Sequence, residues 1–158
     1  MNAAVTVFFL IIKVFSLYFL AVSLFGLCSR RRPEPAARLR RFAVLIAARN
    51  EESCIAGLIE SLRAQHYPPE LVDIWVLPNN CTDRTAEAAR RAGAQVLEMP
   101  ASVRSKGAAL HTAAKALLRS ARNYDAFCVF DADNEADPAF LSEMNRALDR
   151  TAIVKSRI

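Results

Sequence analysis

The stretch Phe42-Ala-Val-Leu-Ile-Ala47, followed at once by Ala48-Arg-Asn-Glu51, decides the fold. A continuous apolar run that ends in polar residues is typical of a strand covered on both faces, as in a parallel sheet. Similar runs follow at Asp73–Leu77 and Ala126–Phe130, with a weaker one at Ala94–Glu98. The sequence therefore predicts a domain built around several buried parallel strands.

Helical patterns separate these runs. Two of them cover Ser53–Gln65 and Lys106–Arg119. Another is capped by Thr82 or Asp83, runs to Arg91 and stops at Gly93. The last starts at Asp137-Pro138. In the Lys106–Arg119 helix we expect Leu110, Ala114, Leu117 and Leu118 to face inward, and Ala152–Val154 to begin a fifth strand. Alternating strands and helices predict an α/β fold with a doubly wound, mostly parallel sheet.

An apolar segment precedes this domain. Ala4–Leu27 contains 24 residues and one charge, Lys13. As a helix it spans about 36 Å, enough for a hydrocarbon core of roughly 30 Å. Sixteen of its residues are Leu, Ile, Phe or Val, and their summed insertion free energy of about −5 to −9 kcal/mol outweighs the cost of Lys13, about 3 kcal/mol. The sequence predicts a transmembrane helix within residues 1–28, in which Lys13 either extends to the membrane surface or meets a polar partner on another membrane helix.

The charge distribution predicts the orientation of this helix. A secretory signal peptide would need a charged N-terminal region, a shorter apolar run and a small-residue cleavage pattern, none of which the sequence offers. Arg30–Arg41 carries +5, and Pro33-Glu34-Pro35 makes 29–41 a linker. By the positive-inside rule we expect a single-pass protein of the cell (inner) membrane with residues 42–158 on the cytoplasmic side.

Composition excludes several other classes of protein. The 53% hydrophobic content excludes low-complexity disorder. Residues 42–158 carry a net charge of −1, so the basic face of a nucleic-acid-binding domain is missing. The four cysteines lie far apart, without a C-x-x-C pair, which supports neither a zinc site nor a disulfide framework; Cys128 is most simply a small buried hydrophobe.

Polar clusters follow three of the expected strands: Ala48–Glu51, Pro78–Asp83 and Asp131–Asn134. Ligands of doubly wound sheets bind outside the carboxyl ends of the strands. Because parallel strands end at the same edge, we expect the three clusters to lie close together and to form the functional site.

Asp131 and Asp133 are the candidate metal ligands. Two residues apart in extended chain, they project to one side and can flank one divalent cation, Mg²⁺ or Mn²⁺, whose remaining ligands are phosphate oxygens and water. Such an ion neutralises a diphosphate leaving group. In the alternative interpretation these carboxylates only cap the next helix, although Asp137 is already available for that.

The remaining candidates have two interpretations each. Asn50 and Glu51 either hydrogen-bond a base or ribose or begin a helix as N-cap and first-turn acid. Asn79 lies in a run of turn and cap residues. Lys106 opens a helix, where an ammonium and backbone N–H groups can meet a phosphate, or it is merely solvated. The glycine spacing of a P-loop is missing.

Together these segments resemble the N-terminal, donor-binding half of a family 2 glycosyltransferase with the GT-A fold. The resemblance rests on Ala47–Glu52, Val76–Thr85, Lys106–Leu110, Phe130–Asn134 and Asp137–Leu141, in the family's order over about residues 42–158. It implies that Ala48, Arg49, Asn50 and Glu51 line the base and ribose pocket. It further implies that Lys106 approaches the diphosphate, Asp131 the nucleotide-sugar and Asp133 the metal.

The resemblance also implies an activity: inverting, metal-dependent transfer of a sugar, commonly from a UDP-sugar, to a lipid-linked or polysaccharide acceptor at the cytoplasmic membrane face. The sequence departs from the family in two places. Asn79 stands at or beside the position of a base-binding acid, and the general base of the family lies in a following half, so no catalytic residue is assigned in this chain. The alternative function is a catalytically inactive, membrane-anchored module that binds nucleotide-sugars or another protein.

Overall fold

The computed structural model describes residues 3–28 and 36–149, and the chain divides into two compact units, Met1–Glu34 and Pro35–Ile158. The first unit contains helix α1 (Ala3–Cys28). Within it, Val5–Leu24 is long and apolar enough to cross a membrane, and its side chains are exposed. Length and composition fit a membrane span and a signal sequence equally.

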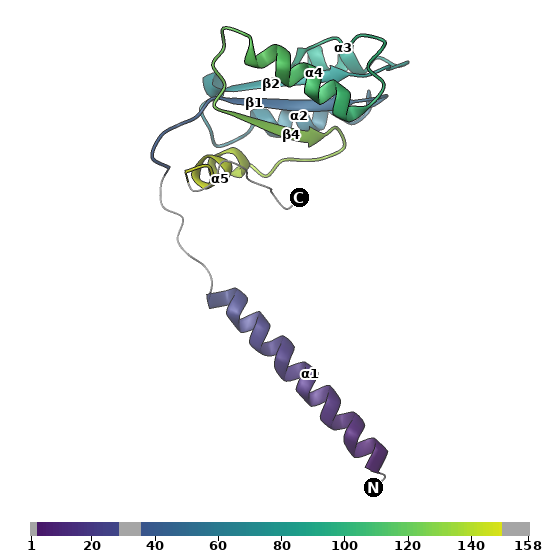
Figure 1. Cartoon of the computed structure of the whole chain (residues 1–158), viewed down its shortest axis with the longest axis vertical. Helices are drawn as coiled ribbons and strands as arrows, with labels where there is room; N and C mark the ends of the chain where they lie inside the picture. Colours follow the sequence, from purple (N-terminus) through teal and green to yellow (C-terminus); the bar gives the residue numbers. More distant parts are fainter. Residues whose placement is uncertain (1–2, 29–35, 150–158) are drawn as a thin grey trace. The chain divides into compact units, whose positions relative to one another are not determined.

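The second unit is built on four parallel strands in the order β3-β2-β1-β4 (Figure 1). Their bounds are β1 Phe42–Ala48, β2 Val72–Pro78, β3 Gln95–Val96 and β4 Ala126–Asp131. Every pairing between neighbouring strands is parallel. The α/β class and the four expected strands are thereby confirmed, whereas the expected strand at 152–154 lies outside the described residues.

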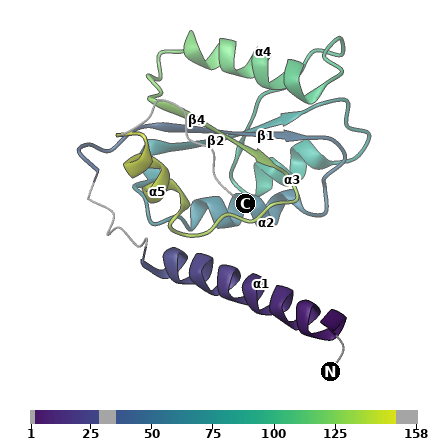
Figure 2. The same ribbon diagram turned by 60° about the horizontal axis from the view of Figure 1, so that its bottom comes forward.

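Helices cover both faces of the sheet. They are α2 (Ile55–Arg63), the short 3-10 helix η1 (Pro69–Leu71), α3 (Thr85–Arg91), α4 (Lys106–Leu118) and α5 (Phe140–Ala147). Figure 2 shows α4 on one face of the sheet, with α2 and α3 on the other. The doubly wound arrangement is therefore confirmed. Because β2 and β3 lie to one side of β1 and β4 to the other, the winding reverses between β1 and β4.

Strand β1 supplies both halves of the core, as its unbroken apolar run predicts. Val44 and Ile46 pack with the buried side chains of α2, whereas Ala43 and Leu45 pack against α4. On the α2 face the buried side chains are Ile55, Leu58, Ile59 and Leu62, joined by Ala88 and Ala89 of α3. Each face of the sheet thus removes a separate set of apolar side chains from water.

The expected inward face of α4 is wrong by about one residue. The structure buries Ala109, Ala113 and Leu117, with Leu110 partly buried, whereas Leu118 is 68% exposed. Small alanines at two positions four residues apart let the helix approach the sheet closely, and this determines which face turns inward. Leu118 and Val129 of β4, which is 49% exposed, leave apolar surface uncovered.

Three arginines that the sequence places in the linker pair with carboxylates of the second unit. The pairs are Arg38–Asp125 at 2.9 Å, Arg40–Asp149 at 2.7 Å and Arg41–Asp73 at 3.1 Å. Arg40 also donates to the carbonyl oxygen of the buried Asn145, at 3.0 Å. The Arg40 contacts fasten the chain just before β1 to the residues around α5, whereas Arg38 and Arg41 join it to the residue before β4 and to β2.

Acid is expected to weaken this attachment. Hydrogen bonds from the Ala37 N–H and from Arg40 lower the pKa of Asp149 below its usual value of 3.8. A carboxyl group whose pKa is lower in the folded protein than in the unfolded chain stabilises the fold at pH values above its unfolded-state pKa. This stability is lost as the pH falls through its folded-state pKa. Below pH 3.8 the free energy of unfolding, measured with urea, should therefore fall less with decreasing pH in the Asp149→Asn variant than in the unmodified protein. Equal pH dependence in the two proteins would contradict this.

Gly93 ends α3 in a conformation that suits glycine. Its φ is +93°, and a Cβ there would lie 2.3 Å from Nη1 of Arg63, which donates to the Ala92 carbonyl. Gly93→Ala is expected to lower the free energy of unfolding by about 1–2 kcal/mol. The matched control is Gly57→Ala inside α2, where a Cβ meets nothing within 4 Å. That change should raise stability by about 0.5–1 kcal/mol, and a change of the same sign in both variants by chemical denaturation would refute the explanation.

Candidate functional site

The three polar clusters begin at the same level of the sheet. In the register of the strands Ala48 lies opposite Pro78, and Ala47 lies opposite Asp131. The residues that follow β1, β2 and β4 therefore leave the sheet side by side at its carboxyl edge. This edge includes the point between β1 and β4 where the winding reverses, which is where ligands of open α/β sheets bind.

Hydrogen bonds join the loop after β1 to the loop after β2. The Asn79 N–H donates to the Ala48 carbonyl at 2.9 Å, and the Asn50 Oδ1 accepts from the Thr82 N–H at 2.8 Å. Asn50 has a φ of +59°, in the left-handed region that asparagine tolerates. Since Cys54 occupies the N-cap of α2, the interpretation of Asn50 as that N-cap is wrong. Its side chain holds the neighbouring loop instead.

Thr85 is the buried connection beneath these loops. Its hydroxyl accepts from the Glu51 N–H at 2.9 Å and donates to Oδ1 of Asp83 at 2.5 Å. The latter bond is the main cause of the lowered pKa of Asp83. Oδ1 of Asp83 also accepts from the Thr85 N–H, as expected for a residue that caps α3, although Arg84 occupies the N-cap position. One hydroxyl thus fixes both loops to the start of α3.

Asn79 is 7% exposed, and its side chain is held by its neighbour. Asn80, with a φ of +52°, donates from Nδ2 to Oδ1 of Asn79 at 2.9 Å and to the Val103 carbonyl at 2.8 Å. The loop before α4 is thereby attached to the same edge. Arg49 is exposed and forms neither a hydrogen bond nor an ion pair within residues 3–28 and 36–149.

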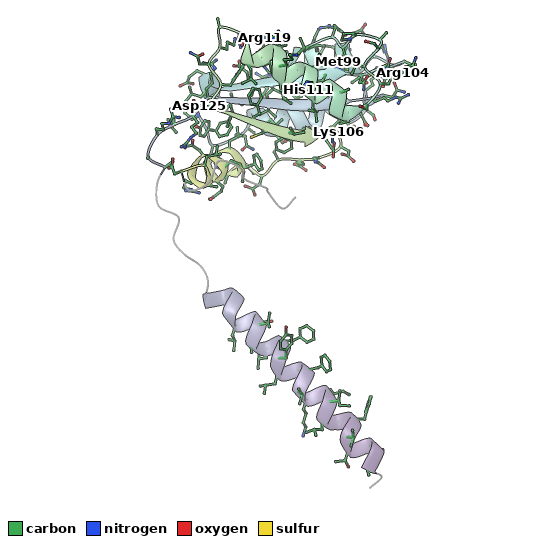
Figure 3. The ribbon with its side chains drawn as sticks, viewed as in Figure 1. Met99, Arg104, Lys106, His111, Arg119 and Asp125 are labelled. Atoms are coloured by element: carbon green, nitrogen blue, oxygen red, sulfur yellow. The ribbon has the colours of Figure 1, made fainter. Side chains whose placement is uncertain are left out.

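Lys106 and Asp131 meet across the first turn of α4 and the end of β4. They form an ion pair, and both side chains are about half exposed. Figure 3 shows Lys106 at the end of α4 that lies beside the tip of β4. Ser105 is the N-cap, and its Oγ accepts from the Ala108 N–H at 3.2 Å. This cap was not predicted from the sequence, although a serine directly before a helix is its usual signal.

Asp133 has different neighbours from Asp131. It lines a pocket of about 500 Å³ whose other walls come from α2 and from the segment after β4, namely Cys54, Gly57, Leu58, Glu60, Ser61, Ala64, Asn134 and Glu135. Within the part of the chain that the structure describes, its exposed carboxylate accepts no hydrogen bond and forms no ion pair. Asp131 thus faces α4, whereas Asp133 lies beside α2. The expectation that both carboxylates project to one side of an extended chain is wrong, because the strand ends at Asp131 and residues 132–133 form a turn.

Cys54 and Glu51 form a contact beside Asp133 that the sequence analysis missed. The Cys54 thiol donates to Oε2 of Glu51 at 3.0 Å. This hydrogen bond, with burial and the nearby charges of Glu51 and Asp133, raises the pKa of Cys54 to about 11. The thiol is therefore neutral at physiological pH and serves as a donor. The spacing Glu-x-x-Cys at a helix start was the available signal, because residues three apart share a helical face.

Comparison with known proteins agrees with this geometry. The model of the family described as "Glycosyl transferase family 2" matches residues 43–157. This chain belongs to glycosyl transferase family 2. The resemblance stated from the sequence is confirmed, and the edge that carries Asp131 and Asp133 lies within the residues that the family matches.

Several relatives are similar over parts of the chain. A probable glycosyltransferase of Bacillus subtilis, YdaM, is 28% identical over 108 residues, which are 64% of this chain and 24% of the relative. A beta-monoglucosyldiacylglycerol synthase of Nostoc is 40% identical over 43 residues, 27% of this chain and 9% of the relative. The mannosyltransferase PcManGT of Pyrobaculum calidifontis, solved with GDP-Man and Mn²⁺, superposes with a TM-score of 0.65 at 22% identity, over 85% of this chain and 40% of that one. The chain thus spans less than half the length of these relatives, and the solved structure shares its fold.

Proposed function

We propose that residues 42–158 of the second unit bind a nucleotide-sugar at the carboxyl edge of the sheet and form the donor-binding part of an inverting glycosyltransferase. The observation that carries this proposal is the common register of the three strand ends, which brings Ala48–Glu51, Asn79 and Asp131 to one edge. The ligands of structurally similar proteins support the ligand class, because PcManGT holds GDP-Man and TarS of S. aureus holds UDP.

The loops after β1 and β2 are proposed to receive the base and ribose. Ala48 presents backbone at the end of β1, and Asn50 and Asn79 fix the two loops against each other. Because these contacts already order the loops, little conformational entropy remains to be lost when a nucleoside binds. Arg49 and Glu51 supply charged groups beside this backbone, and a UDP-sugar is the donor we expect.

The diphosphate is proposed to bind at the start of α4. This helix has 13 residues, and its first-turn N–H groups with the Lys106 ammonium suit an anion. Lys106 is paired with Asp131 at a half-exposed position, where ion pairs contribute little stability. A diphosphate can therefore take over the ammonium at small cost and leave the Asp131 carboxylate to accept hydrogen bonds from the sugar or ribose.

Asp133 is proposed to hold a divalent cation, Mg²⁺ or Mn²⁺. Its carboxylate is exposed and unpaired within the described residues, and the neighbouring donors are oxygen atoms of Asn134 and Glu135. No group of three His, Cys, Asp or Glu side chains able to hold a metal occurs in the described ranges. A cation here would take one or two protein carboxylates and fill its shell with phosphate oxygens and water. When bound, such an ion stabilises the charge of the departing diphosphate.

We further propose that α1 anchors this enzyme in the cell membrane with the second unit on the cytoplasmic side, where it meets a lipid-linked or polysaccharide acceptor. The apolar span Val5–Leu24 supports the anchor, and the likeness to a diacylglycerol glycolipid synthase supports a lipid acceptor. No residue of this chain is assigned as the general base. Donor binding without transfer by a longer form of the protein would favour the alternative, a non-catalytic binding module.

Calorimetry tests the proposed donor site. Lys106→Ala is expected to weaken binding of a UDP- or GDP-sugar in the presence of Mn²⁺ by about tenfold, because a charge-assisted hydrogen bond to phosphate is lost. The matched control is Lys115→Ala, an exposed lysine in the last turn of the same helix, which should bind as the unmodified chain does. Equal losses in the two variants, or no donor binding by the folded chain, would refute the proposal.

A further inference from the structure

Helix α1 carries its lysine, serine and threonine side chains on one face, whereas Tyr18 lies on the opposite face. Thr6, Lys13, Ser16 and Ser23 follow one another at spacings of seven, three and seven residues. This is the spacing of the facing positions in a left-handed helix pair. Small residues on one side of a membrane helix are typical of a surface that packs against another helix, because they let the two backbones approach closely. The Ser23 hydroxyl itself donates to the Phe19 carbonyl at 2.8 Å.

A hollow lies on the same face. Val5, Thr6, Phe9, Leu10 and Lys13 line a depression of about 310 Å³. Four of these residues stand at positions i, i+3, i+4 and i+7, which is the set that forms a hole for a side chain of a facing helix in knobs-into-holes packing. Shape and polarity therefore point to the same side of α1.

Lys13 has no partner in the described part of the chain, where it forms neither an ion pair nor a hydrogen bond. It lies eight residues after Val5, the start of the apolar span, so about 12 Å separates the two along the axis. A lysine side chain reaches roughly 6 Å, which leaves its ammonium inside the span even when it points toward the nearer end. A charge at such depth is costly, and a polar partner on a neighbouring helix offsets this cost.

A second copy of this helix cannot supply that partner. Residues 1–28 contain neither Asp nor Glu. In a parallel pair of copies the two Lys13 ammonium groups would face each other at the same depth, and like charges repel strongly where water is excluded. Charge complementarity instead requires a carboxylate.

We propose that the Thr6–Lys13–Ser16–Ser23 face of α1 packs against a second membrane helix that places an Asp or Glu side chain beside Lys13. This inference rests on the proposed membrane anchorage of the enzyme. Helix α1 is then an assembly element as well as an anchor, and its one charge selects the partner.

Photo-crosslinking of the full chain in phosphatidylcholine–phosphatidylglycerol vesicles tests this proposal. The probe is a Leu–Ala helix of about 20 residues with one central Glu. Benzoylphenylalanine replaces Phe9, four residues before Lys13 and on its face, or Phe15, two residues after Lys13 and on the opposite face. We expect about fivefold more adduct from position 9 than from position 15. The excess of adduct from position 9 over position 15 should vanish in the Lys13→Leu variant, and also when Gln replaces the central Glu of the probe. It should return when the Lys13→Glu variant is combined with a probe that carries a central Lys.

The other outcomes are distinct. A chain that inserts but cross-links equally from both positions, or keeps its adduct after Lys13→Leu, overturns this inference and leaves the donor site untouched. A predominant adduct between two copies of the chain overturns the requirement for a carboxylate. A chain recovered outside the vesicles contradicts the membrane anchorage in the proposed function, and with it this inference.

Discussion

Replacing Asp133 with alanine is expected to weaken Mn²⁺-dependent binding of a nucleotide-sugar by about 100-fold. The Asp133 carboxylate is exposed, lines the pocket beside Cys54 and has no protein partner within the described residues. Asp131, in contrast, is paired with Lys106. Asp133 is therefore the carboxylate that is free to bind a cation before the donor arrives. Calorimetric titration of UDP- and GDP-sugars, with Mn²⁺ and with a chelator, measures the effect.

The control for this change is Glu70→Ala. Glu70 is an exposed carboxylate in η1, which leads into the start of β2 and so lies at the opposite edge of the sheet. The Glu70→Ala substitution removes the same charge as Asp133→Ala without changing the proposed site. The donor affinity of the Glu70→Ala variant should therefore match that of the unmodified chain. In the Asp133→Ala chain we expect the remaining affinity to be independent of Mn²⁺. Retention of a full Mn²⁺ effect would show that the metal binds elsewhere.

Thr85→Val is expected to lower the free energy of unfolding by about 2 kcal/mol. The change keeps the shape of a fully buried side chain but removes the hydroxyl that accepts from the Glu51 N–H and donates to Asp83. Because these bonds join the loops after β1 and β2, donor affinity should fall as well, although Thr85 is not itself proposed to touch the donor. Urea unfolding and calorimetry measure the two effects.

Thr112→Val provides the matched control. The Thr112 hydroxyl donates only to the Ala108 carbonyl within α4 and is on the surface. We therefore expect a change in stability well below that of Thr85→Val, and no change in donor affinity. If the two valine variants behaved alike, the connecting role of Thr85 would be wrong.

The fold was predictable because its signals are local. The apolar run of β1 identified a strand buried on both faces, and Gly93 marked the end of α3, where its φ is +93°. The inward face of α4 was not predictable in detail, because Ala109 and Ala113 turn inward to fit a sheet formed by distant segments. The pairing of Arg38, Arg40 and Arg41 with domain carboxylates also depends on long-range contacts. From the sequence alone, those arginines were interpreted only as the positive charges that orient the membrane helix.

The site divides in the same way. The strand order and the polar clusters predicted that Asp131 lies at the carboxyl edge shared with Ala48, and the register confirms this, with Asp131 as the last residue of β4. The separate neighbours of Asp131 and Asp133 were not foreseen, because side-chain direction beyond the end of a strand is not fixed by its alternation. Nor was the role of the Thr85 hydroxyl, because its bond with the Glu51 N–H joins residues that are 34 apart in the chain. The contact of the Cys54 thiol was not predicted either, although the Glu-x-x-Cys spacing offered a signal for it. These residues contact the loops rather than extend into solvent.

Paramagnetic broadening of backbone amide signals by Mn²⁺ in the presence of UDP tests the central claim most directly. With the isotope-labelled full chain in detergent micelles, we predict that signals of residues 49–54, 79–83 and 131–135 broaden first. Signals near Asp73 and Asp125 at the amino ends of the strands should persist, because seven strand residues separate the two edges by about 20 Å. Broadening centred on the amino edge, or none when UDP and Mn²⁺ are both present, would contradict a donor and metal site at the carboxyl edge.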